Sequence, residues 1–333
     1  MRRVPALDRL RAAALLLMLV QHLTEWLHGD PRSVLPGWEG FVVTDVCAPA
    51  FTVAAGASAV LMAEAMRRKG RRLIDATVVR RYGLLVPLGV AIHWVLWGDP
   101  LSWGVLETLG IVVVVSTLLA RRVPVGVLAA VAGVALVVGP LVAERMAGDD
   151  LVTRILGPGF PLVTYLGFAV VGAIAARLVL DGRDRVPEAL VLGALLAAVA
   201  AVELARGVPP DRHPGTFVGF VVPGLAGTLL LYGALGRWSP PRPVDAVLGP
   251  AAAHTLGIFV GQYAVYWAMR ASGLLHTIAG GPAVALAVGG AVALTLVSPF
   301  VPPLPWSPRT GWSRGYAPKT SASTSGTGRS SWA

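Results

Sequence analysis

The sequence predicts an all-α protein, a polytopic transmembrane helical bundle of about ten spans. Its 333 residues are 55% hydrophobic and only 14% charged, whereas an ordinary soluble domain carries about 25% charged residues. The mean hydropathy is +0.68. Apolar runs close to the roughly 20 residues that cross a bilayer recur along almost the whole chain. Too little polar surface is available for a soluble globule.

The expected spans follow one another with short polar connections. The first begins in the charged segment 7–11, the second contains Pro49, and the ninth includes His254 near its start. Spans four, five and seven consist largely of Ala, Val and Leu, so we expect them to serve as packing helices. The ten ranges are 8–28, 40–64, 79–97, 103–120, 123–142, 159–180, 187–205, 216–236, 244–269 and 278–300.

The net charge of +10 indicates topology rather than a nucleic-acid partner. With these spans, 22 of the 28 Lys and Arg residues fall on one side of the membrane. Cytoplasmic loops carry such an excess, so we expect a cell-membrane protein with both termini in the cytoplasm and a basic side in contact with membrane lipids. No small-residue cleavage site follows the first span, which we expect to remain as an anchor.

We expect one membrane-embedded domain over residues 1–301 and a disordered cytoplasmic tail over residues 302–333. The tail is rich in Ser, Thr and Gly and holds few large apolar residues. The one cysteine, Cys47, cannot form an internal disulfide, and no Cys and His cluster has zinc spacing, so no metal is expected. The oligomeric state is left open.

The first span carries the strongest functional pattern. Asp8 and Arg11 lie three residues apart at its start, and His22 and Glu25 lie three apart near its end. Residues at this spacing share a helix face. We therefore expect Glu25 to hold one ring nitrogen of His22, which leaves the other to take a proton from an acceptor. The alternative is a headgroup-zone ion pair and a buried, hydrogen-bonded histidine.

Two further acidic residues lie within predicted spans. Asp45 precedes Pro49, and a proline frees a helix carbonyl and bends the helix. A carboxylate at this place faces either a cavity or a partner cation, and the sequence does not decide between them. Glu107 lies within the fourth span. The neighbours Trp94 and Trp97 favour a core or interfacial position for His93.

Three motifs resemble known proteins. Leu7-Asp8-Arg9-Leu10-Arg11, ten residues and then His22 resemble the first span of the integral-membrane acyltransferase superfamily. The segment Trp38 to Phe51, with Gly56 and Ser58 after it, is similar to the second span of the heparan-α-glucosaminide N-acetyltransferase branch. Residues 97–110 resemble the segment that opens the fourth span there. The resemblance covers residues 7–110 and is thin beyond them.

The resemblance implies transfer of an acyl group, commonly acetyl from acetyl-CoA, to a hydroxyl or amine of a carbohydrate or lipid-linked acceptor. It implies His22 as the catalytic base, with Glu25 or Asp45 orienting it and His28 as the second candidate. In the eukaryotic enzyme the proposed catalytic histidine corresponds to a position close to Leu35 here. Ala12 also departs from the glycine that many relatives carry.

The donor acyl-CoA is a polyanion and requires cations on the cytoplasmic side. The segment 67–81 is basic and lies on that side in the predicted topology. Arginine forks suit phosphates. Arg80 and Arg81 open the third span, where the resemblance implies an Arg-rich start, and they are with Arg11 the candidates for donor binding. For most of this basic segment, plain positive-inside topology is the better explanation.

Two other functions compete with an acyltransferase. A transporter or flippase of a polar or lipid-linked substrate would use the same polar cavity without acyl chemistry. It predicts inverted repeats with broken helices in both halves, and the sequence shows no paired interruption. A catalytically inactive membrane scaffold is the third hypothesis, and it would tolerate the loss of His22.

Overall fold

In the computed structural model the chain is described over residues 4–35, 38–71, 74–146, 148, 150–157, 159–182, 186–205 and 217–300. These residues are almost all helical and include no strand. The predicted tail, residues 302–333, lies outside them.

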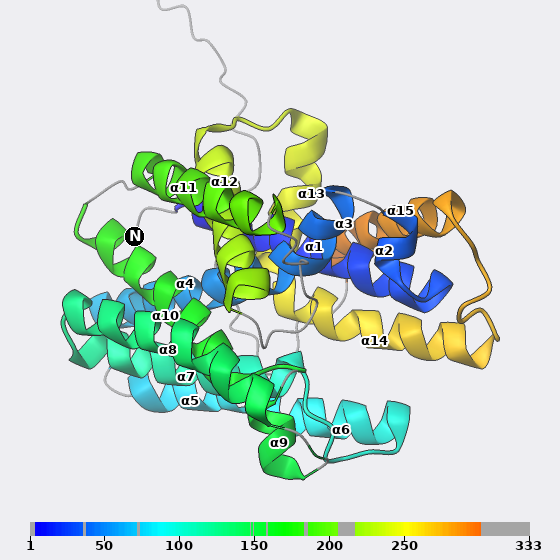
Figure 1. The fold of residues 1–333 in the computed structure, drawn as a ribbon, viewed down its shortest axis with the longest axis horizontal. Coiled ribbons are helices and arrows are strands. Elements are labelled where there is room, and N and C mark those ends of the chain that lie inside the picture. The colour runs from blue at the N-terminus through cyan, green and yellow to red at the C-terminus, as the bar shows by residue number, and fades with distance from the viewer. Residues whose placement is uncertain are drawn as a thin grey trace, which may run out of the picture.

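The elements follow the expected ranges in order (Figure 1). They are α1 (Pro5–His28), α2 (Pro31–Val34), α3 (Trp38–Phe41), η1 (Val42–Val46), α4 (Cys47–Arg68), α5 (Ile74–Gly83), α6 (Leu85–Trp97), α7 (Val105–Arg122), α8 (Val125–Arg145), α9 (Leu151–Leu156), α10 (Leu162–Leu180), α11 (Val186–Ala205), η2 (Phe217–Val221), α12 (Val222–Arg237), α13 (Arg242–Ala253), α14 (Thr255–Ala271), α15 (Gly281–Val297) and η3 (Ser298–Phe300).

The number of membrane-spanning helices differs from the predicted ten. Among the described residues, seven helical segments are long and apolar enough to cross a membrane, or eight if a bent pair counts as one span. Helices α7 and α11 are not in this number: α7 includes three charged residues within 18, and the apolar part of α11 is shorter. The helical membrane fold is thus confirmed, and the count of ten is not.

The predicted ninth span, 244–269, is broken rather than continuous. Helices α13 and α14 meet at His254 with a bend of 90°. Pro250 lies inside α13 and has no backbone N–H, so the last turn before the break lacks a helix hydrogen bond. The break sets α14 in a direction different from that of α13. Helix α14 carries Gln262 and Tyr263, which lie near the end of α1.

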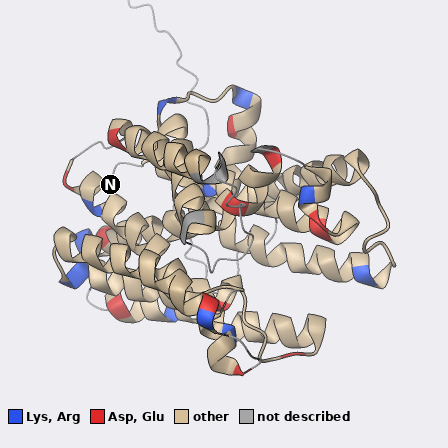
Figure 2. Cartoon of the chain, in the orientation of Figure 1, with Lys and Arg blue, Asp and Glu red and all other residues tan. Residues whose placement is uncertain are grey.

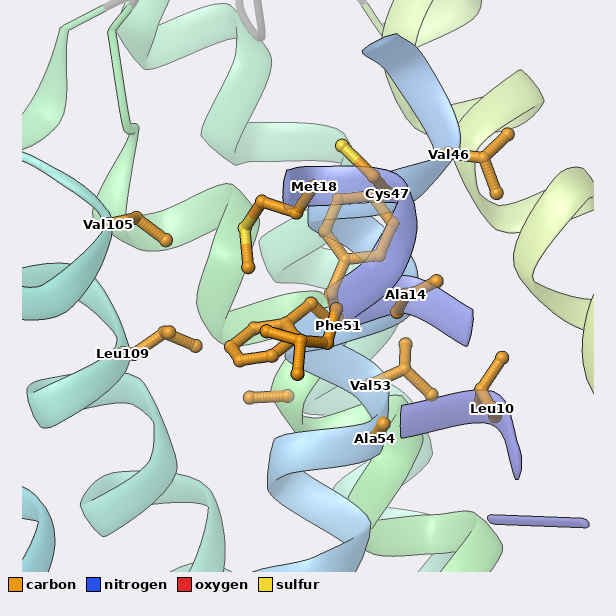
Figure 3. Packing of buried hydrophobic residues seen from close by; sticks show 14 of the residues in the cluster. Leu10, Ala14, Met18, Val46, Cys47, Phe51, Val53, Ala54, Val105 and Leu109 are labelled. Atoms are coloured by element: carbon orange, nitrogen blue, oxygen red, sulfur yellow. The ribbon is translucent and has the colours of Figure 1, made fainter. Parts of the chain in front are cut away.

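Helix α1 lies at the centre of the bundle and packs against α4, α12, α13, α14 and α15. Figure 3 shows Leu10, Ala14 and Met18 of α1 beside buried residues of α4, with Leu109 of α7 facing the same core. Helix α10 packs closely on α4, because a side chain at Gly172 or at Gly56 would collide with a backbone carbonyl of the other helix. Small residues permit such close packing in membranes.

A π-helical turn, η1, joins α3 to α4 and precedes Pro49. Pro49 cannot donate to the carbonyl of Asp45, so the wider turn accommodates the missing hydrogen bond. The side chain of Asp45 is buried in this turn. The proline identified in the sequence therefore changes the helix locally and places a carboxylate inside the bundle.

Charged side chains lie mostly towards helix ends and connections (Figure 2). Several arginines bond to the free carbonyls at the end of another helix. Arg9 donates to Leu235 O at 2.9 Å, Arg177 donates to Ala120 O, and Arg270 donates to Leu96 O. The last carbonyls of a helix have no partner within it and carry partial negative charge. These residues thus join helices and do more than set topology.

Acid should weaken one connection between α6 and α9. Arg154 binds the carboxylate of Asp99, and this guanidinium holds the pKa of Asp99 below its ordinary 3.8. A carboxyl with a lowered folded pKa contributes stability above about pH 3.8 that is lost as the pH falls through the folded value. We expect thermal unfolding temperatures to fall less between about pH 6 and about pH 3 in Asp99→Asn than in the wild type. An equal fall would show that the pair contributes nothing.

Candidate active site

His22 lies near the end of α1 and is held by a residue far away in the sequence. Its Nδ1 lies 3.1 Å from Oε1 of Gln262, a fully buried side chain on α14. Because a carbonyl oxygen can only accept, Nδ1 carries the hydrogen and Nε2 keeps its lone pair. The geometry gives His22 the tautomer that a general base or nucleophile needs.

Glu25 was expected to hold this ring, and the structure places Gln262 there instead. The side chain of Glu25 is exposed, one turn beyond His22. The Asp8–Arg11 pair at the other end of α1 is present, with Arg11 Nη2 3.0 Å from Asp8 Oδ1. Helix periodicity thus predicted the charged pair correctly, whereas the partner of His22 depends on tertiary packing.

His28, the second candidate, connects α2 to the segment between α14 and α15. Its Nδ1 lies 3.2 Å from Ile278 O, and its Nε2 lies 3.0 Å from Ser33 Oγ. Both ring nitrogens are therefore within hydrogen-bond distance of protein groups. The arrangement suits the attachment of the segments that follow α1 and α14 better than proton transfer.

Asp45 forms an ion pair with Arg32. Arg32 Nη2 lies 2.5 Å from each carboxylate oxygen, and Arg32 Nε donates to Thr44 Oγ1 at 3.2 Å. Of the two interpretations that the sequence left open, the structure shows the partner cation. The pair connects α2 to the π-helical turn and so positions the segment that follows α1.

Five aromatic side chains form a cluster beside His22. Its members, which we call the aromatic cluster, are Trp26, Trp97, Phe259, Tyr263 and Tyr266. The His22 ring stacks on Trp26, with centroids 5.7 Å apart and 23° between the planes. The indoles of Trp26 and Trp97 both contact the rings of Tyr263 and Tyr266. Helices α1, α6 and α14 thereby share one aromatic surface.

A second histidine lies at the other end of the aromatic cluster. The ring of His93 is 5.2 Å from that of Trp97, and its Nδ1 lies 2.9 Å from Oε1 of Glu107. Glu107 is fully buried, and its other oxygen accepts from Gly104 N at 3.2 Å. Sequence reasoning missed this pair because the two residues lie on different helices.

The residues predicted to bind the donor occupy different surroundings. Arg11 donates to Ser58 Oγ of α4 at 3.1 Å in addition to its contact with Asp8. Arg81 lies against Met62 Sδ and the ring of Tyr82, whereas Arg80 is exposed. Of the three, Arg80 is the one that presents its guanidinium to the surface. Among the described residues, no group of three His, Cys, Asp or Glu side chains could hold a metal ion.

Comparison with known families identifies the chain. A model of the catalytic domain of heparan-α-glucosaminide N-acetyltransferase matches residues 3–202, more than half of the sequence. The chain belongs to this family. It is therefore a membrane acetyltransferase of the heparan-α-glucosaminide N-acetyltransferase type, as the three motifs predicted. A search of curated proteins found no match.

The candidate site extends beyond the matched region. His22, Asp45, His93 and Glu107 lie within residues 3–202, but the whole of α14 lies after them. Gln262 and both tyrosines of the aromatic cluster are therefore contributed by the part of the chain that the family comparison does not cover.

Proposed function

We propose that the chain transfers an acetyl group from cytoplasmic acetyl-CoA to a hydroxyl or amine of a carbohydrate-type acceptor, at or across the cell membrane. In this proposal both termini lie in the cytoplasm, the donor binds on the basic side, and the acceptor binds near the outer ends of α1 and α14. The family membership supports acetyl transfer, and its description names an amino sugar acceptor.

The observation that carries the mechanism is the tautomer of His22. Gln262 holds Nδ1–H, so Nε2 is the atom that can act. It either takes the proton of the acceptor as that group attacks the acetyl carbon, or takes the acetyl group itself and passes it on. Stacking on Trp26 fixes the plane of the ring in both cases.

Gln262 offers a second group to the reaction. Its Nε2 is buried and has no hydrogen-bond partner among the described residues. Leaving a buried donor unsatisfied costs about 1–3 kcal/mol. The carbonyl oxygen of a thioester would satisfy it and would gain negative charge during acyl transfer, when a donor stabilises it most. The residues present therefore fit an acyl donor.

Calorimetry on the detergent-purified protein tests the donor. Acetyl-CoA should bind, and dephospho-CoA and ATP should bind more weakly. Dephospho-CoA lacks the 3′-phosphate and the acyl group, whereas ATP carries phosphates but lacks the acyl-bearing arm, so the two controls report on different parts of the donor. Incubation with acetyl-CoA and a soluble α-glucosaminide, followed by mass spectrometry, then tests transfer. The absence of both binding and product would overturn the proposal.

Arg80 is the residue that we expect to contact the phosphates of the donor. Loss of one charged contact to phosphate, about 1.4 kcal/mol, should raise the KM for acetyl-CoA about tenfold in Arg80→Ala and leave kcat nearly unchanged. Arg145→Ala is the matched control, because Arg145 is also exposed at a helix end but lies on the side predicted to be outside. Equal KM values for Arg80→Ala and the wild type would leave Arg80 with a role in topology alone.

The bend between α13 and α14 is the observation that favours a transporter. Transporters bind substrates at broken helices, but those breaks occur as a pair related by an internal repeat. The described residues contain one strongly bent pair of this kind. Uptake of labelled glucosaminide into proteoliposomes without acetylation would support transport and count against the acetyltransferase.

A further inference from the structure

The site contains two histidines whose surroundings are alike in part: Nδ1 of His22 is hydrogen-bonded, whereas Nδ1 of His93 makes an ion-pair contact that lacks hydrogen-bond geometry among the described residues. In each, Nδ1 lies beside a side-chain oxygen, Gln262 Oε1 for His22 and Glu107 Oε1 for His93. Each ring packs on a tryptophan, and the two tryptophans share Tyr263 and Tyr266. One imidazole therefore lies at each end of the aromatic cluster, and in His22 the nitrogen that remains beside the hydrogen-bonded Nδ1 is Nε2.

The pair of His93 and Glu107 occupies a space that the sequence keeps open. A side chain at Gly89 would collide with the Glu107 carboxylate, and one at Gly104 would collide with the His93 ring. Glu107 is fully buried, whereas the side chain of His93 is 13% exposed. The His93 ring thus lies between the buried carboxylate and the outer surface of the bundle.

Helix capping alone does not account for Glu107. Its Oε2 accepts from Gly104 N at the start of α7, and a neutral glutamine would do the same. An ionisable group that is fully buried among helices is costly unless a partner compensates it. The carboxylate adds the ability to stabilise a positive charge on His93, which is what a base needs once it has taken a proton.

We propose that His93 is the acceptor-side general base of this acetyltransferase and that Glu107 is its positioning residue. His22 then acts on the acyl side, where it carries the acetyl group or lies against the thioester. The inference rests on the proposed function. It adds an assignment of the two histidines to the two halves of the reaction.

The proposed step is attack of the acceptor on the acetyl carbon. The acceptor oxygen or nitrogen bonds to the acetyl carbon as its proton moves to Nε2 of His93. The bond between that carbon and its carrier, either the CoA sulfur or Nε2 of His22, breaks with the electron pair leaving on the carrier. His93, now positive beside Glu107, releases the proton through its exposed edge.

The test separates catalysis from packing. Three variants, His93→Gln, His93→Gly and Glu107→Gln, are compared with wild type for acetyl-CoA affinity by calorimetry and for kcat with the α-glucosaminide. We expect unchanged affinity, a kcat about 100-fold lower for both His93 variants, and a kcat at least about tenfold lower for Glu107→Gln. Trp94→Leu is the matched control, because Trp94 is on the same helix and 65% exposed, and its kcat should equal that of the wild type.

Imidazole in the buffer decides between a base and a structural residue. It should restore part of the activity of His93→Gly, because the added ring replaces the missing base. It should restore none of the activity lost in Glu107→Gln and should leave the activity of Trp94→Leu unchanged. Full activity in His93→Gln, or a kcat loss without rescue and with weaker acetyl-CoA binding, would overturn the inference. Wild-type protein that neither binds nor uses acetyl-CoA would instead overturn the proposed function.

Discussion

His22→Gln is expected to lower the kcat of acetyl transfer by about 10²- to 10⁴-fold, the usual contribution of a positioned acid–base group, and to remove transfer altogether if His22 carries the acetyl group. Glutamine keeps a polar side chain of similar length that can donate to Gln262 Oε1. It has no lone-pair nitrogen to replace Nε2. The variant should therefore fold and insert normally.

The measurement is product formation at saturating acetyl-CoA, together with the affinity for acetyl-CoA and the unfolding temperature in detergent. His28→Gln is the informative comparison, because both ring nitrogens of His28 lie against protein groups. It should keep most of its activity. Full activity in His22→Gln would exclude the mechanism, and loss of activity in His28→Gln alone would assign the base to His28.

Asp45→Ala is expected to lower the free energy of unfolding by about 3–5 kcal/mol. The substitution removes the carboxylate that both holds Arg32 in a bidentate pair and lies buried in the π-helical turn. A buried charge that loses its partner is more costly than the pair was favourable. The expected effect is on stability first, and on activity through the position of α2 and the segment after α1.

A double-mutant cycle with Arg32→Met measures the pair directly. Asp45→Ala combined with Arg32→Met should be more stable than Asp45→Ala alone, because the uncompensated charge is then gone. Unfolding temperatures and retained acetyl-CoA binding report the result. If Asp45→Ala were as stable as wild type but inactive, Asp45 would belong to the chemistry, as one of the two sequence interpretations held.

The predicted helices correspond closely to those in the structure because apolar length and charge act locally. Each of the ten predicted ranges is mostly helical over its described residues, and Pro49 indeed alters its helix. The break at His254 was not foreseen. Pro250 also occurs inside a helix, and its effect depends on what the two halves pack against, which hydropathy does not record.

The site was predicted only in part, for a related reason. His22 stood out because a titratable ring inside an apolar helix is costly wherever the helix packs. Its partner Gln262 lies 240 positions further along the chain. The helix spacing rule that places Glu25 on the same face as His22 applies only within one helix, so it cannot predict a partner on another helix. Glu107 was noted, but its pairing with His93 joins two helices and therefore required their packing.

Composition and charge were sufficient for the class of protein and its helices, because these depend on burial in lipid. The family followed from three motifs that lie within single spans. Partner choice was different. Which oxygen holds His22, which cation holds Asp45, and which helix end each arginine caps all follow from contacts between distant segments. Such contacts form only when the bundle closes, since a polar group buried among helices takes whichever partner the packing brings within hydrogen-bond distance.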